Sequence, residues 1–506
     1  MKRSLCRLVA LCVSGLLAAC GGSSSTNCGG GCSQLATHFS VTTPQDATVG
    51  APFSFTVTAL DSSNVVAASY AGMVHFASTD SEAVLPANST LANGTRTFSA
   101  TFNTIGSQTI TATDAVTLTI TGISNAIQVS SAPPVGTFTP TASNMNFPRA
   151  GHTATLLQDG TVLIVGGENS TGPLATAEIF NPSSSTFTAT SGSMETARVG
   201  HTATLLTDGT VLVAGGNDTT GALTSAEVFN PATGMFTPTT GNMGAARVGH
   251  TATLLNDGTG KVLIAGGGSS PEVLFGPVAD PGTASAELFD PKSGQFTPAG
   301  NMSESRIYGT ATLLANDGVL VAGGSAGNPN GSALGDLFQP ASATFAATAN
   351  GGTTATHLAA ALLQDGTVLL TGGEDLGPFC QFGALPWVSI KNALLFSSSN
   401  ATFSETSDMS SSRVSHTATL LTGGEVLIAG GASNSAMCDR GIAKSTPLVS
   451  VSSAELFNPA GTFTPTGSMS TARAGHTATL LGDGTVLVVG GVDANGNALA
   501  SAELFQ

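Results

Sequence analysis

An arginine and an acidic residue recur together along this chain, and a guanidinium–carboxylate ion pair is the chemistry that these two residue types suggest. Each arginine opens a copy of a short motif whose fullest form is RAGHTATLL, and each acid lies in a later motif of the form AELF. The arginines are Arg149, Arg198, Arg247, Arg306, Arg413 and Arg473. The acids are Glu178, Glu227, Glu287, Asp336, Glu455 and Glu503.

One further copy of the two motifs lacks both charges. We align its Thr354 with the arginines and its Leu394 with the acids. Because losing one partner alone would leave an uncompensated charge, the joint loss favours one structural ion pair in each of the other copies. The alternative is a ring of arginines around a channel mouth that collects anionic ligands.

Six histidines belong to the same repeats, and histidine is a common general base and metal ligand. Because they recur in nearly every copy, we assign them to the scaffold and not to catalysis. They are His152, His201, His250, His357, His416 and His476. The segment from Asp493 to Asn497 alternates oxygen-bearing side chains but lacks the closing acid of a calcium loop, so we predict a turn there and no metal site.

The repeats also predict the elements that position these residues. Each copy has two apolar runs around a two-residue turn, usually Asp-Gly, which is the strongest short signal for a hairpin. A Gly-Gly pair, a loop and two further strand-like runs follow. Seven such units predict an all-β fold, a seven-bladed β-propeller over residues 132–506. Since the chain stops at a third strand, we expect an N-terminal strand around Phe138 to complete the last blade and close the ring.

Three units have unusually long loops between their second and third strands, at residues 268–286, 374–393 and 432–454. We expect these loops on one face, beside the arginines, where a rigid scaffold commonly carries its binding residues. Trp387 could stack on a sugar or anchor a protein; the alternative is that it packs its own loop. The candidate binding residues are Trp387, Phe379, Phe382, Lys391, Arg440 and Lys444.

The cysteines suggest an oxidising compartment. Cys380 and Cys438 occupy matching places in two of the long loops, so we predict a disulfide between them, with two free thiols as the alternative. Residues 1–19 have a basic start and an apolar run of signal-peptide length that ends in Leu-Ala-Ala before Cys20. This ending resembles the lipobox of bacterial lipoproteins. The resemblance implies lipidation of Cys20; the alternative is an ordinary cleaved signal peptide.

Two segments separate the signal from the propeller. Residues 20–34 are rich in glycine and serine and predict a flexible tether. Residues 35–131 contain six or seven alternating runs that predict a β-sandwich. The sandwich resembles the bacterial Ig-like domains of surface proteins, which implies a spacer, or alternatively an adhesive module.

The Gly-Gly pairs and the repeat length of about 50 residues resemble kelch repeats, over about 370 residues of the chain. Among kelch-type propellers, galactose oxidase and its relatives hold copper with two tyrosines, two histidines and a Tyr–Cys crosslink. Only Tyr308 lies in the predicted propeller, because Tyr70 belongs to the sandwich. We therefore do not expect copper-radical oxidase activity, and we expect no cofactor.

Charge limits the partners of this chain. Its 31 acidic and 15 basic residues leave a net charge of −16, which disfavours nucleic acid and anionic lipid surfaces. We expect a monomeric protein, lipid-anchored to the bacterial cell envelope (the outer membrane of a diderm), that binds an unknown protein or glycan through its long loops without catalysis. The alternative is a hydrolase or isomerase acting on carbohydrate at the channel mouth. A cluster of non-repeat acids and histidines there would favour the enzyme, and the sequence shows none.

Overall fold

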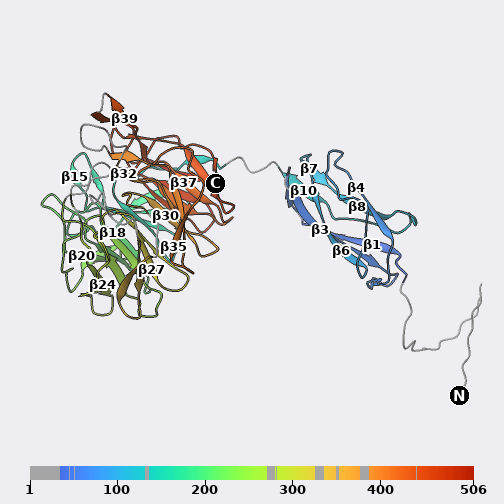
Figure 1. Cartoon of the computed structure of the whole chain (residues 1–506), viewed down its shortest axis with the longest axis horizontal. Helices are drawn as coiled ribbons and strands as arrows, with labels where there is room; N and C mark the ends of the chain where they lie inside the picture. Colours follow the sequence, from blue (N-terminus) through green and yellow to red (C-terminus); the bar gives the residue numbers. More distant parts are fainter. Residues whose placement is uncertain are drawn as a thin grey trace, which may run out of the picture. The chain divides into compact units, whose positions relative to one another are not determined.

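The computed structural model describes residues 35–44, 46–50, 52–130, 136–270, 280, 282–324, 335–348, 353–376, 387–439 and 442–506. These residues form β-strands and no helix. The described part of the chain thus offers no helix of the length and apolarity needed to cross a membrane. Contacts divide the chain into two units, Met1–Pro134 and Val135–Gln506 (Figure 1).

The described part of the N-terminal unit has three sheets around one apolar core, with strand orders β1-β3-β6, β2-β10-β7 and β5-β4-β8-β9. Alternation along β3 explains the core, because Phe55, Val57 and Ala59 are buried while the residues between them are more exposed. The strands are β1 (His38–Thr42), β2 (Asp46–Thr48), β3 (Pro52–Leu60), β4 (Met73–Ser78), β5 (Ser89–Thr90), β6 (Thr95–Thr101), β7 (Gly106–Gln108), β8 (Ile110–Asp114), β9 (Thr121–Ile123) and β10 (Ile127–Ser130).

The described part of the C-terminal unit contains seven four-stranded antiparallel sheets, which we number one to seven. Sheet one holds β12 (Thr153–Leu156), β13 (Val162–Val165), β16 (Ala177–Asn181) and β17 (Thr186–Ala189). Sheet two holds β18 (Thr202–Leu205), β19 (Val211–Ala214), β20 (Ala226–Asn230) and β21 (Met235–Pro238). Sheet three holds β22 (Thr251–Leu254), β23 (Val262–Ala265), β24 (Ala286–Asp290) and β25 (Gln295–Pro298).

The remaining sheets follow the same order of strands. Sheet four holds β26 (Thr310–Leu313), β27 (Val319–Ala322), β28 (Asp336–Gln339) and β29 (Thr344–Ala347). Sheet five holds β30 (Ala359–Leu362), β31 (Val368–Thr371), β34 (Ala393–Ser397) and β35 (Thr402–Glu405). Sheet six holds β36 (Thr417–Leu420), β37 (Val426–Ala429), β42 (Ala454–Asn458) and β43 (Thr462–Pro465). Sheet seven holds β44 (Thr477–Leu480), β45 (Val486–Val489), β46 (Ala502–Phe505) and β11 (Phe138–Pro140).

Among the described residues, four short two-stranded sheets lie in the loops between second and third strands. Their strands are β14 (Glu168–Asn169), β15 (Gly172–Pro173), β32 (Glu374–Leu376), β33 (Trp387–Ser389), β38 (Ala432–Ser433), β41 (Val449–Ser450), β39 (Ala436–Asp439) and β40 (Ile442–Ser445).

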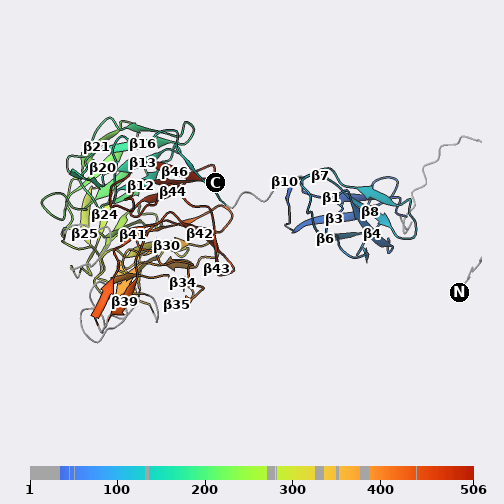
Figure 2. The same cartoon turned by 90° about the horizontal axis from the view of Figure 1, so that it is seen from above.

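The seven sheets stand around a common axis. Their first strands contact one another in chain order, and β44 of sheet seven contacts β12 of sheet one. The labels β12 and β44 are neighbours in Figure 2. Sheet seven combines both ends of the unit, because β11 pairs with β46 in the register Phe138↔Phe505. This circular arrangement is a β-propeller.

Each sheet owes its form to a few repeated residues. In sheet one Gly160 supplies the left-handed turn between the first two strands, with φ of 83°, and the Asp159 carboxylate accepts hydrogen bonds from both the amide and the hydroxyl of Thr161. The second strand, VLIV, is buried throughout because neighbouring sheets cover both of its faces. Phe180 on the third strand packs on Phe187 of the fourth, with ring centroids 4.9 Å apart.

Candidate functional site

Six of the seven sheets bury an arginine in one repeated environment. In sheet one, Arg149 Nη2 lies 3.0 Å from Glu178 Oε1 and Nη1 donates to the carbonyls of Gly166 and Thr176 at 2.7 and 3.0 Å. We call this set, two carbonyls and one carboxylate, the guanidinium socket. Glu178 also accepts the amide of Asn146 at 2.8 Å, so the pair secures the loop before the first strand.

The same ion pair occurs in the other five sheets that carry both charges. The distances are 2.8 to 3.0 Å, and the arginine side chains are at most 2% exposed. Burial lowers the pKa of the Arg149 guanidinium, while Glu178 opposes that shift. Arginines held in this way are scaffold and do not form a ring that faces solvent. The pairs are Arg149–Glu178, Arg198–Glu227, Arg247–Glu287, Arg306–Asp336, Arg413–Glu455 and Arg473–Glu503.

Five repeat histidines join neighbouring sheets. Each shares a hydrogen bond of 2.9 to 3.2 Å between its Nε2 and a threonine hydroxyl of the preceding sheet. Burial, followed by the nearby Arg247, lowers the pKa of His250 to about 3. A neutral imidazole is therefore part of each sheet-to-sheet contact. The five are His152, His201, His250, His416 and His476.

His357 is not one of these repeat histidines, so the sequence alignment of sheet five was wrong by one residue. The first strand of this sheet begins at Ala359, which makes Leu358 the counterpart of the histidines. Ala355, not Thr354, replaces the arginine, because its carbonyl accepts the amide of Gly324 as the Arg198 carbonyl accepts that of Gly167. The alanine-rich strand offers too little apolar contrast to reveal its register from sequence alone.

The residue two places after each arginine, or after Ala355, forms a ring of backbone hydrogen bonds. Each amide donates to the carbonyl of its counterpart in the preceding sheet at 2.8 to 3.4 Å, all the way around the axis. Every member has a positive φ of 52 to 64°, which is easy for glycine and strained for other residues. The members are Gly151, Gly200, Gly249, Tyr308, His357, Ser415 and Gly475.

Three adjacent sheets carry side chains at this ring position. Tyr308 stacks on His357, with ring centroids 4.2 Å apart and planes 18° from parallel, and His357 Nδ1 lies 3.4 Å from Glu374 Oε1. The Glu374 carboxylate is fully buried, and Ser415 continues the ring on the far side of His357. We call Tyr308, His357, Glu374 and Ser415 the channel-mouth cluster. The structure thus brings one non-repeat histidine, His357, to the channel, with a single buried acid, Glu374, behind it.

Three of these four residues, Tyr308, His357 and Ser415, open onto the axial cavity. A space of about 270 Å³ is lined by these three residues together with three of the ring glycines and the edges of four repeat histidines. The glycines are Gly151, Gly200 and Gly249, and the histidines are His152, His201, His250 and His416. The signal in the sequence was the residue before the repeat histidine, which is glycine in four sheets and becomes Tyr308, His357 and Ser415 in three. It was missed because His357 was aligned with the histidines themselves.

The loops of sheets five and six meet through Asn434. Its amide nitrogen Nδ2 donates to the Trp387 carbonyl at 3.1 Å, and its Oδ1 accepts the amide of Ser389 at 2.8 Å. Trp387 is half-buried, and the exposed Lys391 lies 3.3 Å from Asp408. These hydrogen bonds join the two loops that the predicted disulfide would also join.

Several predicted site residues fall outside what the structure describes. Phe379, Cys380, Phe382 and Arg440 lie beyond the described residues, as do Cys20 and the signal segment. Cys438 and Lys444 lie on β39 and β40, whose side chains at these positions are not described. The disulfide between Cys380 and Cys438 and the roles of these loop residues thus remain predictions.

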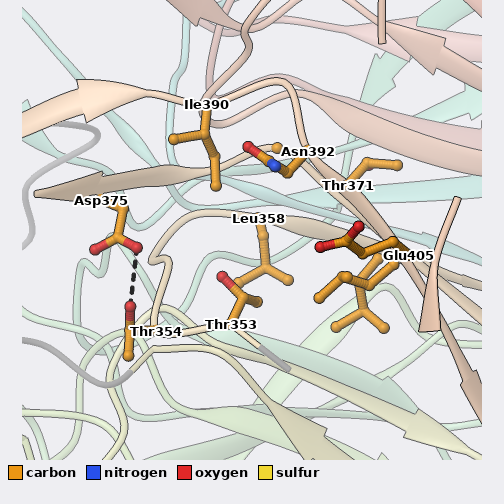
Figure 3. Close-up of a pocket in the computed structure, with 11 residues that line it drawn as sticks. Thr353, Thr354, Leu358, Thr371, Asp375, Ile390, Asn392 and Glu405 are labelled. Carbon is orange, nitrogen blue, oxygen red and sulfur yellow. Dashed lines mark hydrogen bonds between the residues drawn. The ribbon is translucent and has the colours of Figure 1, made fainter. Parts of the chain in front are cut away.

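Sheet five, which lacks the ion pair, contains a pocket in its place. The pocket has a volume of about 340 Å³. Asp375 and Glu405 lie on opposite sides of it, with Leu358 between them and Thr354 donating to the Asp375 carboxylate at 2.9 Å (Figure 3). It is lined by Thr353, Thr354, Leu358, Leu370, Thr371, Gly372, Asp375, Ile390, Asn392, Leu394 and Glu405.

Two solved structures are similar to this chain. A fungal alcohol oxidase of the AA5 family, solved in complex with copper, shares 18% identity, covers 74% of this chain and 76% of its own, and superposes with a TM-score of 0.55. The fold is that of the galactose-oxidase-like β-propellers. A second structure, YjhT, shares 17% identity over 71% of this chain and 95% of its own, with a TM-score of 0.46. No protein-family model and no curated protein matches the sequence.

The residues of this propeller do not fit the copper site of two tyrosines and two histidines. Tyr308 is its single tyrosine, since the chain has two and Tyr70 donates its hydroxyl proton to Asp114 in the N-terminal unit. The repeat histidines share their Nε2 atoms with threonines. Over the described residues, no three His, Cys, Asp or Glu side chains gather as metal ligands would. No copper-dependent step is derived for this chain.

Proposed function

We propose that this chain is an exported surface lipoprotein whose propeller binds a protein or glycan without catalysis. The signal-like residues 1–19 and the following Cys20 support export and lipidation. The sheets around one core in the N-terminal unit support an Ig-like spacer. Seven four-stranded sheets whose first strands contact in a circle support a seven-bladed, kelch-type propeller.

The observation that carries the binding role is where the repeat breaks down. Tyr308, His357 and Ser415 replace ring glycines in sheets four to six, and Ala355 and Leu394 replace the ion pair in sheet five. All of these positions lie just before first strands or where a third strand begins, and those of sheets five and six adjoin the loops joined by Asn434. Since the scaffold is what all sheets share, the concentrated departures mark the surface that has another task.

Glycan and peptide arrays test this role. The chain from Leu35 onward retains every described residue and avoids the lipid. We expect array ligands whose binding falls at least tenfold in Trp387→Ala, since a central aromatic anchor commonly dominates a binding surface. Phe147→Ala is the matched control, because Phe147 is an exposed aromatic residue before sheet one and should leave binding unchanged. Ligands whose affinity is unchanged by Trp387→Ala, or falls equally in Trp387→Ala and Phe147→Ala, would contradict binding at this surface.

The channel-mouth cluster favours a second candidate, a carbohydrate hydrolase or isomerase. A carboxylate beside an imidazole, as Glu374 lies beside His357, is the arrangement of an oriented general base. A screen of sugar substrates, repeated with His357→Ala, tests it. Turnover that the variant loses while its unfolding is unchanged would support catalysis. Absence of turnover would leave binding as the function, and turnover that survives the change would show that His357 is not the general base.

A further inference from the structure

We propose that the pocket in sheet five binds a guanidinium group supplied by a ligand, which the arginine side chain of a protein partner would provide. This proposal rests on the binding role above and deepens it, because it names the chemistry that one part of the surface recognises. Its starting point is the guanidinium socket of the other six sheets, where the same backbone already holds an arginine of the chain itself.

The backbone half of the socket is kept in sheet five. Gly372 has a φ of 55°, close to the 60° of Gly166 in sheet one. Its amide donates to the Asn392 carbonyl at 3.0 Å, as that of Gly166 donates to Thr176 at 3.1 Å. The two carbonyls that accept an arginine elsewhere therefore keep their arrangement. Among the described residues, none donates a hydrogen bond to the Gly372 carbonyl.

The chain's own arginine is missing, and the space remains open. Ala355 replaces the arginine, and the 340 Å³ pocket lies within the range of about 300 to 1,000 Å³ that is common for small-molecule sites. Lys391 lies in the chain between the pocket residues Ile390 and Asn392, but its ammonium pairs with Asp408. Leu358, Leu370 and Ile390 form an apolar wall that could contact the methylene stem of an arginine.

The negative charge of the socket has moved by one strand. In sheet five Leu394 replaces the acid of the third strand, and Glu405 lies directly opposite it on the fourth strand. The other six sheets have alanine or proline opposite their acid. Glu405 is exposed at one side of the pocket and Asp375 lines the other (Figure 3). Sheet five thus lost its cation but kept carboxylates facing the space.

Guanidinium fits this combination better than ammonium does. Its planar fork carries five N–H donors and can reach carbonyls and a carboxylate together, whereas an ammonium offers three donors from one point. A net charge of −16 would also draw cationic ligands toward the protein. We therefore expect the pocket to rank arginine above lysine.

Titration with capped arginine (N-acetyl-arginine amide) tests the pocket. Trp387 is the single tryptophan of the chain, so its fluorescence reports events near sheet five, with calorimetry as the second readout. We expect capped arginine to bind at least tenfold more tightly than capped citrulline, its uncharged analogue, and measurably more tightly than capped lysine. Equal binding of arginine and citrulline, or binding of neither, would overturn the proposal.

Ethylguanidine, tested in parallel, separates two sources of the group. Binding as tight as that of capped arginine would indicate a site for small guanidines. Much weaker binding would indicate that the peptide backbone also contributes, as expected for an arginine of a protein partner. Either result with charge selectivity supports guanidinium recognition, and loss of all selectivity contradicts it.

Two variants locate the binding. Glu405→Gln should weaken capped arginine at least fivefold, whereas Glu195→Gln, a change of an exposed glutamate in the segment before sheet two, should not. Ala355→Arg with Leu394→Glu restores the ion pair of the other sheets and should abolish binding by filling the socket. Because Glu405 is exposed, its change keeps the test decisive even if the double variant fails to fold. Wild-type affinity in Glu405→Gln would overturn the proposal.

The outcomes distinguish this inference from the binding role on which it rests. Suppose that array ligands require Trp387, contain no guanidinium and do not compete with capped arginine. That result would support the proposed binding surface and contradict guanidinium binding in the pocket. If capped arginine binds at sheet five but no glycan or peptide on the arrays binds, the pocket proposal is supported and the proposed binding surface is not. A partner lost in both Trp387→Ala and the refilled double variant would support both.

Discussion

Sheets two and five are built on the same plan and use it differently. In sheet two Arg198 fills the socket, Gly200 forms the ring and His201 bonds to Thr153 of sheet one. In sheet five the corresponding residues are Ala355, His357 and Leu358. In sheet two the ion pair secures the loop before the first strand, and His201 bonds to the neighbouring sheet. Sheet five instead has an open pocket and an imidazole at the channel. If the proposed binding role is correct, stability and recognition use the same positions of the repeat.

The largest effect should come from breaking the pair in sheet two. Arg198→Ala leaves Glu227 buried without its cation, which should cost about 3 to 5 kcal/mol of unfolding free energy. Urea unfolding of the chain from Leu35 onward measures it, with Glu195→Gln, an exposed position in the segment before the same sheet, as the control. A loss below about 1 kcal/mol would mean that the pair is not a structural requirement, and the comparison of the two sheets would fail.

A smaller effect should appear in the pH dependence of stability. Burial holds the pKa of His250 at about 3 in the folded protein, below the 6.5 of an unperturbed histidine. The unfolded chain therefore binds the extra proton first, so His250 leaves stability untouched above pH 6.5 and reduces it as the pH falls from 6.5 toward 3. Each such histidine contributes up to about 1.4 kcal/mol per pH unit in that window.

His250→Gln should flatten this dependence. Between pH 6.5 and 5 the variant should lose about 2 kcal/mol less than the wild-type chain, measured by urea unfolding at each pH. His38→Gln, an N-terminal-unit change on a partly exposed histidine, is the control and should leave the slope of the propeller transition unchanged. Parallel curves for wild type and His250→Gln would show that this histidine is not buried in its neutral form.

The smallest effect should come from relieving strain in the ring. Ser415 adopts a φ of 52°, where four of the seven ring positions have glycine. Ser415→Gly should raise the unfolding free energy by about 0.5 to 1 kcal/mol, since a left-handed conformation is costly for residues with a Cβ. Thermal unfolding measures the gain, with Ser411→Gly, at a neighbouring serine without a positive φ, as the control. A loss of stability instead would show that the serine side chain contributes more than its backbone strain removes.

The sequence predicted much of the scaffold for a physical reason. Repetition revealed which arginine belongs with which acid, and the structure places all six pairs within 3.0 Å. The third-strand ending of the chain pointed to the strand at Phe138, which pairs with Phe505. Such features follow from hydrogen-bonding patterns that every unit repeats, so one unit helps to interpret the next.

The candidate site was harder to predict because it lies where repetition stops. Alignment by letters placed His357 with the repeat histidines, and only the register of β30 shows that it belongs to the ring beside Tyr308. The sequence also did not reveal that Glu405 lies opposite Leu394, which stands where the other sheets have their acid. That relation depends on which residues pair across the third and fourth strands. A substitution found in only one unit has no second example to compare with, so its cross-strand partner cannot be inferred from the sequence.

The most direct measurement is the location of capped arginine on the folded chain. Methyl NMR with labelled isoleucine compares Ile390, which lines the pocket of sheet five, with Ile164 and Ile264 in the buried second strands of sheets one and three. We expect the Ile390 methyl signal to shift with saturation while the other two stay in place. Unchanged Ile390 signals, or shifts in sheets one and three alone, would contradict guanidinium binding at sheet five, the sheet that lacks the ion pair.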